Sequence, residues 1–276
     1  MTVRRNPITG EPVLFAPERA ARPRAFTDSA DDARCPFCPG HEADTPPEIA
    51  RIGDPWRVRV IPNKYPALPG AEVIVEAAEH DATSASLTHT ADVVRVYAER
   101  YRAHRDAAYV SIFRNEGAGA GGSFDHVHSQ LIPMPFVPPR IERESNAFAR
   151  SARCPLCTGG DAVVIRETST MTWLAPAASS MAYQQWIVPK RHVTNIAALD
   201  SAELDELAPL LRAAYAGMHS IAGALNSCLI NFPRAGAGHF YVDLFPRVTA
   251  IAGFELATGT FVEIIDPAAA AQRLRG

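Results

Sequence analysis

The chain has 276 residues, of which 47% are hydrophobic and 21% are charged, and its formal net charge is −3. This composition is ordinary for a globular protein, and no basic block predicts nucleic acid as a partner. No apolar run approaches the roughly 20 residues of a transmembrane helix, and the N-terminus lacks the apolar core of a signal peptide. These features predict a cytoplasmic protein that does not contact a membrane.

Predicted strands and one helix fill the first part of the chain. Residues 90–105 carry apolar side chains at helical spacing, which predicts a helix. Alternating or continuous apolar runs predict strands at 12–15, 56–61, 72–76, 110–113 and 126–132. A glycine-rich segment, 115–123, separates the last two strands. The pattern therefore predicts a mixed α and β fold.

The same order recurs in the second part of the chain. Strands are predicted near 171–174, 185–188 and 229–232, and helical spacing covers 202–225. Two histidines lie at matching separations in each part: 46 residues between His80 and His126, and 47 between His192 and His239. This match predicts an internal duplication, with one half at 1–150 and the other at 151–276. Tyr241 stands where the first half has His128.

Four of the five cysteines form two Cys-x-x-Cys pairs, one at the start of each repeat. In a cytoplasmic chain of this length, such pairs favour metal or redox chemistry over structural disulfides. Two thiolates and two imidazoles in each half would suit a closed tetrahedral site for structural Zn²⁺, with two ions per chain. The predicted ligands are Cys35, Cys38, His80 and His126, and Cys154, Cys157, His192 and His239.

The segment from Asn115 to Gln130 carries the predicted chemistry. On a strand, His126 and His128 point to the same side, and the glycines before them would let backbone N–H groups approach an anion. If His126 binds metal, His128 is left for nucleophilic attack on a phosphoryl group. The alternative is a flexible glycine loop that leads into a strand with structural histidines. The remaining histidines, His41, His89, His104 and His219, are predicted to be surface residues.

Several segments together resemble the galactose-1-phosphate uridylyltransferase family of the histidine-triad superfamily. They are residues 4–10, 16–23 and 62–66, both cysteine pairs, Ser123 with His126-Val-His-Ser-Gln130, Phe245-Pro246 and Gly253-Phe-Glu255. The resemblance implies an α+β fold, in which two tandem histidine-triad-like halves form one continuous, mainly antiparallel sheet flanked by helices. It also implies a homodimer.

The resemblance assigns a role to each matching residue. His128 would attack the α-phosphorus of a nucleotide sugar, such as UDP-glucose, to form a covalent nucleotidyl-histidine, and Gln130 would bind the nucleotidyl phosphate. Ser123 and Asn115 match phosphate contacts, and Asn63 matches a nucleotide contact. Arg19 and Arg22 match arginines near the site, although solvated charge is the alternative in so arginine-rich a segment.

Some positions depart from the family pattern. Val127 replaces the usual proline of the motif, and Thr249–Ala252 stands where the family has a lysine before its Gly-Tyr-Glu. Residues 257–260 look more like nucleotide-sugar phosphorylase relatives. The acceptor is thus a sugar 1-phosphate or phosphate, and a phosphorylase or nucleotide hydrolase is the alternative. A non-catalytic nucleotide-binding protein is the competing class.

Overall fold

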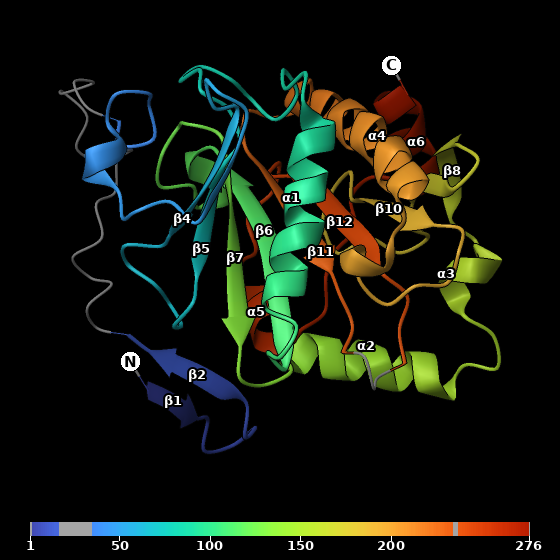
Figure 1. Cartoon of the computed structure of the whole chain (residues 1–276). Helices are drawn as coiled ribbons and strands as arrows, with labels where there is room; N and C mark the ends of the chain where they lie inside the picture. Colours follow the sequence, from blue (N-terminus) through green and yellow to red (C-terminus); the bar gives the residue numbers. More distant parts are fainter. Residues whose placement is uncertain (1, 17–34, 234–236, 276) are drawn as a thin grey trace.

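The computed structural model describes residues 2–16, 35–233 and 237–275 (Figure 1). Twelve strands are present in this part: β1 (Thr2–Arg5), β2 (Pro12–Phe15), β3 (Ala50–Ile52), β4 (Val58–Pro62), β5 (Glu72–Val75), β6 (Tyr109–Glu116), β7 (His128–Met134), β8 (Val163–Glu167), β9 (Met171–Ala175), β10 (Gln185–Pro189), β11 (Leu225–Ile230) and β12 (Tyr241–Pro246). The α-helices are α1 (Thr90–Ala103), α2 (Pro139–Arg150), α3 (Pro155–Thr158), α4 (Ser201–His219), α5 (Gly253–Thr258) and α6 (Pro267–Arg275). Short 3-10 turns are η2 (Glu42–Asp44), η3 (Ala118–Ala120) and η4 (Ile196–Ala198).

Ten of these strands form one sheet in the order β3-β4-β5-β7-β6-β11-β12-β10-β9-β8. Every pair of neighbours in it is antiparallel. The sheet consists of two sets of five strands with the same connection order, β3-β4-β5-β7-β6 from one edge and β8-β9-β10-β12-β11 from the other. The two sets join where β6 pairs with β11. The predicted α+β fold with one continuous antiparallel sheet is therefore confirmed. The division into halves at residue 150 stays a prediction.

Helices α1, α4 and α6 cover one face of the sheet (Figure 1). Strand periodicity places alternate side chains on this face, so Ile74, Ile112 and Leu131 are buried against helical residues such as Val94 and Leu211. Helix α4 starts at a capping box, in which Asp200 and Glu203 satisfy each other's backbone N–H groups. These helices bury one face of the sheet and do not cover the opposite face.

Helix α2 packs against the opposite face of the second half. Its Ile141 and Phe148 join a separate apolar cluster with Phe232 and Tyr241. This helix was not predicted from the sequence. It follows the proline-rich run 135–139, and all of its residues except Ile141 are at least partly exposed, so it has little apolar periodicity. Over the first half, the same face carries a cavity instead.

No helix within the described ranges is both long enough and apolar enough to cross a membrane.

Candidate functional site

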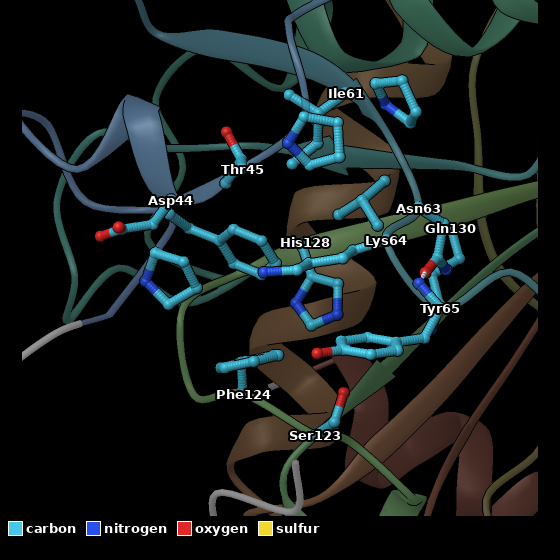
Figure 2. A pocket seen from close by; sticks show the side chains of 15 residues that line it. Asp44, Thr45, Ile61, Asn63, Lys64, Tyr65, Ser123, Phe124, His128 and Gln130 are labelled. Atoms are coloured by element: carbon cyan, nitrogen blue, oxygen red, sulfur yellow. Dashed lines mark hydrogen bonds between the residues drawn. The ribbon is translucent and has the colours of Figure 1, made fainter. Parts of the chain in front are cut away.

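The cavity lies over β4, β5 and β7, on the face that the helices do not cover. Ile61, Val73 and Gln130 are paired across these three strands and all line it. Its volume is about 530 Å³, which is within the size range of small-molecule sites. The described side chains around it are mostly apolar, with a few polar groups gathered near His128 (Figure 2).

His128 is the first residue of β7, and the residue as a whole is 6% exposed. Its Nδ1 lies 2.8 Å from the backbone oxygen of His126. A carbonyl oxygen can only accept, so Nδ1 carries the proton and the lone pair of a neutral ring lies on Nε2. The Phe37 ring packs 5.4 Å from the imidazole, centroid to centroid. The ring is therefore held in one orientation and one tautomer, as a nucleophile requires.

The end of β5 holds the histidine motif from the neighbouring strand. The N–H of Glu76 donates to the Val127 carbonyl at 3.1 Å, and Val75 pairs with His128. On the helix side, the Tyr97 hydroxyl bonds both the Glu76 carboxylate and, at 2.7 Å, the Ser129 hydroxyl. Glu76 also forms an ion pair with the buried Arg114. These contacts were not predicted, since the sequence gives no sign of which polar residues meet behind a strand.

Part of the glycine-rich segment, which was predicted to face an anion, is folded into a turn that uses its own N–H groups. The N–H groups of Ala120 and Gly122 donate to the Gly117 carbonyl at 3.1 and 3.2 Å, and that of Gly121 donates to the Ala118 carbonyl at 3.0 Å. These three donors are used inside the turn and do not face an anion, whereas a role for the other N–H groups of the segment stays a prediction. Gly117 has a φ of 82° and approaches Gly223 closely, so the glycines serve the tight turn that leads to Ser123.

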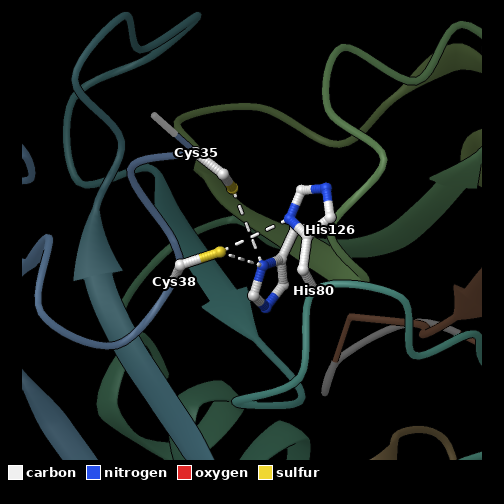
Figure 3. A group of neighbouring side chains, drawn as sticks. All are labelled: Cys35, Cys38, His80 and His126. Atoms are coloured by element: carbon white, nitrogen blue, oxygen red, sulfur yellow. Dashed lines mark hydrogen bonds between the residues drawn. The ribbon is translucent and has the colours of Figure 1, made fainter. Parts of the chain in front are cut away.

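The first Cys2His2 group lies beside the cavity (Figure 3). The Cys38 Sγ is 3.4 Å from the His80 Nδ1 and 3.6 Å from the His126 Nδ1, and the Cys35 Sγ is 3.7 Å from the latter. In a tetrahedral zinc site, bond lengths of about 2.3 Å to sulfur and 2.05 Å to nitrogen give a separation of about 3.5 Å between such atoms. The four side chains are therefore spaced as a metal site requires.

The buried histidine of this group is prepared for metal binding. The His126 Nε2–H donates to the Ala77 carbonyl at 2.8 Å, so the lone pair on Nδ1 faces the two thiols. Burial lowers the pKa of His126, which keeps the ring neutral, and burial with the nearby Cys38 raises the pKa of the Cys35 thiol to about 11. The peptide between His126 and His128 thus joins the metal group to the predicted nucleophile.

The second Cys2His2 group repeats this geometry. The His239 Nδ1 is 3.4 Å from both the Cys154 and the Cys157 sulfur, and the His192 Nδ1 is 3.4 Å from the Cys157 sulfur. The His239 Nε2–H donates to the Pro189 carbonyl at 2.9 Å, and burial lowers the pKa of His239 to about 4. All eight predicted ligands are thus gathered in two groups that could hold a metal ion each.

The structure brings together only part of the predicted substrate site. Asn63, Ser123, His128 and Gln130 line one cavity. Asn115 is not among its lining residues; instead, its side-chain oxygen accepts a hydrogen bond from Asn226 at 2.8 Å, where β6 meets β11. Arg19 and Arg22 lie outside the described residues.

Four further lining residues were not assigned a role by sequence reasoning. Phe37 and Phe124 pack against each other with ring centroids 5.1 Å apart and form an apolar wall. Lys64 and Tyr65 extend into the cavity from the turn after β4 (Figure 2). Both residues belong to segment 62–66, which resembles the uridylyltransferase family, and this resemblance could have identified them as candidates.

The four other histidines were predicted to be surface residues, but each is partly buried and forms a hydrogen bond. The Nδ1 of His41 lies 2.8 Å from the Cys35 carbonyl, and the Nε2 of His89 lies 2.7 Å from the Glu76 carbonyl. In the remaining two, Nε2 contacts a carboxylate: His104 with Glu72 at 2.7 Å, and His219 with Glu116 at 2.9 Å.

The matching position in the second half is filled by protein. The Tyr241 hydroxyl bonds Glu144 and Arg140 of α2 at 3.0 and 3.1 Å, and Arg140 also pairs with Asp243 at 2.9 Å. Asp243 stands where β7 has Gln130. Burial and the Asp243 carboxylate raise the pKa of Tyr241 well above its usual value, so the phenol stays protonated at neutral pH.

We therefore predict that Tyr241→Phe still forms the nucleotidyl-histidine implied for His128 and still turns over a nucleotide sugar. Its cost should appear in stability, at about 1–2 kcal/mol for one buried hydroxyl with two partners. Thermal unfolding and a turnover assay on the same preparation would measure both. Loss of labelling in a protein that unfolds normally would move the chemistry to the second half.

Comparisons with known proteins agree with this geometry. No family model matches the chain. ADP-glucose phosphorylase of Arabidopsis thaliana is 29% identical, in an alignment that covers 99% of this chain and 92% of the plant protein. Galactose-1-phosphate uridylyltransferase of Thermotoga maritima is 25% identical over 100% of this chain and 98% of that protein.

Solved structures give the same result. The crystal structure of the Arabidopsis thaliana ADP-glucose phosphorylase with bound ADP-glucose matches with a TM-score of 0.82 at 27% identity, covering 99% of this chain and 98% of that one. A uridylyltransferase structure at 24% identity has the same fold, with a TM-score of 0.84 over 100% of this chain and 97% of that one.

The sheet and its cavity thus define an α+β protein of the uridylyltransferase fold. The chain is a homologue of galactose-1-phosphate uridylyltransferases and of ADP-glucose phosphorylase, which confirms the resemblance found in its sequence.

Proposed function

We propose that the protein transfers a nucleoside monophosphate from a nucleotide sugar to a phosphate acceptor, through a covalent bond to His128. One observation carries the proposal: the hydrogen bond from the His128 Nδ1 to the His126 carbonyl leaves the lone pair on Nε2, in a cavity that Ser123 and Gln130 also line. The enzymes named among its homologues support the same class of reaction. A nucleotide-binding protein without catalytic activity would not require a histidine fixed in this tautomer in the cavity.

The chemistry follows in two displacements. The Nε2 electron pair of His128 forms a bond to the α-phosphorus, while the bond from phosphorus to the bridging oxygen breaks and its electrons leave with the sugar 1-phosphate. The ring becomes cationic, and its Nδ1–H bond to the His126 carbonyl becomes stronger. Ser123 and Gln130 donate to the non-bridging oxygens. An acceptor phosphate oxygen then attacks phosphorus, and Nε2 recovers its electron pair.

The metal in both Cys2His2 groups is proposed to be Zn²⁺, with two ions per chain. Two thiolates and two imidazoles at tetrahedral spacing are its usual closed donor set. Such an ion supplies no reacting atom here; it holds the segment that carries His126, and so places His128. The spacing and the oriented Nδ1 atoms support this assignment.

The relatives suggest two pairs of donor and acceptor. A UDP-glucose-like donor with a sugar 1-phosphate acceptor corresponds to the uridylyltransferase relatives. ADP-glucose with inorganic phosphate corresponds to the plant phosphorylase, whose similarity covers 99% of this chain. The second pair is the alternative function, and a hydrolase using water in place of the phosphate is the third.

A homodimer is proposed from the surface of the C-terminal segment. Large apolar side chains are exposed along it, including Phe254 at 54%, Leu256 at 76% and Val262 at 60%. Several large apolar side chains exposed within one segment support an interaction site there. A cytoplasmic location stays a prediction from the sequence.

Initial-rate kinetics test the proposed function. Because one histidine serves both displacements, UDP-glucose or ADP-glucose varied against inorganic phosphate or galactose 1-phosphate should give parallel double-reciprocal lines. UDP-glucose and ADP-glucose assayed side by side would identify the donor. Intersecting lines would require both substrates to be bound at once and would contradict the covalent route.

A further inference from the structure

Lysine is rare in this protein, and one of its two lysines lines the cavity. The sequence contains 27 basic residues, of which only Lys64 and Lys190 are lysines. Lys190 lies on the surface, 3.7 Å from the Glu167 carboxylate. Lysine carries a compact point charge on a flexible stem, whereas arginine carries a broad planar one. The position of Lys64 therefore suggests a use for that compact charge.

The turn that carries Lys64 is held firmly beside the nucleophile strand. The N–H of Asn63 donates to the Ala71 carbonyl at 2.8 Å, and the Asn63 side-chain oxygen accepts from the Tyr65 N–H at 2.9 Å. Prolines 62 and 66 restrict the backbone on both sides. Lys64 extends from this turn across the cavity that contains His128 (Figure 2).

The Lys64 ammonium is available to an anion in the cavity, because it forms no ion pair within the described part of the chain. Among the described lining residues, Lys64 is the one cation and Asp44 the one carboxylate. No ion pair joins Lys64 to a described residue, whereas Lys190 has one. The diphosphate of a nucleotide sugar is anionic, and bringing it to an apolar cavity requires a partner cation.

We propose that the Lys64 ammonium binds the diphosphate of the donor at His128 and stabilises the charge of the leaving phosphate. The inference rests on the proposed function. As the phosphorus–oxygen bond breaks, its electrons collect on the oxygen of the departing sugar 1-phosphate, and an ammonium nearby favours that state over the ground state. Lys64 touches the substrate and gives up no proton. In the second displacement, it holds the attacking phosphate.

Rapid-quench measurement of nucleotidyl-His128 formation tests this role. Lys64→Met keeps the length of the side chain and removes its charge, so the covalent step should slow by about 10²-fold. Lys64→Arg restores a charge and should recover at least a tenth of the wild-type rate. The matched control, Lys190→Met, should equal the wild type. A Lys64→Met rate within twofold of the wild type would overturn the proposal.

Lysine acetylation tests the contact in the unaltered protein, and so does not depend on how a variant folds. With only two lysines, each can be followed by peptide mass spectrometry. ADP-glucose, UDP-glucose or glucose 1-phosphate should protect Lys64 and leave Lys190 reactive. Equal protection by uridine or adenosine, which lack phosphate, would assign Lys64 to the nucleoside and contradict a phosphate role.

The two proposals fail differently. If the wild-type protein formed no covalent nucleotidyl-histidine with either donor, the proposed function would fall. If the wild type were labelled and Lys64→Met were labelled equally fast, the function would stand and the role of Lys64 would be rejected.

Discussion

His128→Ala is expected to abolish turnover. Removing a covalent nucleophile costs about 10⁴-fold or more in rate, because the remaining groups can bind the substrate and not react with it. His128 is 6% exposed and its Nδ1 bonds a backbone carbonyl, so the variant should fold with a modest loss of stability. A coupled assay that detects 10⁻⁵ of the wild-type rate, with both donors, would measure the effect.

Two controls make this result specific. Metal content should be unchanged in His128→Ala, since His126 supplies the ligand and His128 does not. Lys190→Met alters a surface residue outside the cavity and should keep most of the activity. Turnover by His128→Ala within tenfold of the wild type would show that His128 is not the nucleophile.

Cys35→Ser is expected to lose one metal ion per chain and to destabilise the protein. Binding of a structural metal contributes directly to folding free energy, so losing a thiolate ligand should cost several kcal/mol. At about 2–4 °C for each kcal/mol in a chain of this size, the midpoint of thermal unfolding should fall by about 10 °C. Activity should fall with it, because His126 of the same group precedes the nucleophile by two residues.

Elemental analysis after purification without chelators would follow the metal. The wild type should contain two ions and Cys35→Ser one. Cys228→Ser is the matched control, as this cysteine belongs to neither group and should keep two ions. Two ions in Cys35→Ser, or none in the wild type, would contradict a metal site at these residues.

The strands and the metal groups were predictable because they leave periodic signals. Apolar runs identified β4, β5, β9 and β10, and two Cys-x-x-Cys pairs, each followed by two histidines in the same order, identified all eight residues of the two groups. Such patterns record which residues share a face, and the fold preserves this relation. The motif around His128 was found in the same way.

Other features depend on contacts that the sequence does not encode locally. The sequence did not show that the N–H groups of Ala120, Gly121 and Gly122 bond within the turn, because whether an N–H faces outwards depends on the path of the loop. Asn115 was predicted to touch phosphate, yet the pairing of β6 with β11 gives it Asn226 as a partner. Helix α2 was missed, since its apolar residues are few and the surface that it covers is formed by distant strands.

The most direct test is intact-protein mass spectrometry of the wild type, incubated with UDP-glucose or ADP-glucose without an acceptor. We expect a mass increase equal to one UMP or AMP group per chain, located on the peptide that contains His128. Acid should release it, base should not, and inorganic phosphate or glucose 1-phosphate should discharge it. A protein that turns over the donor and never carries this mass, or carries it away from His128, would contradict the account.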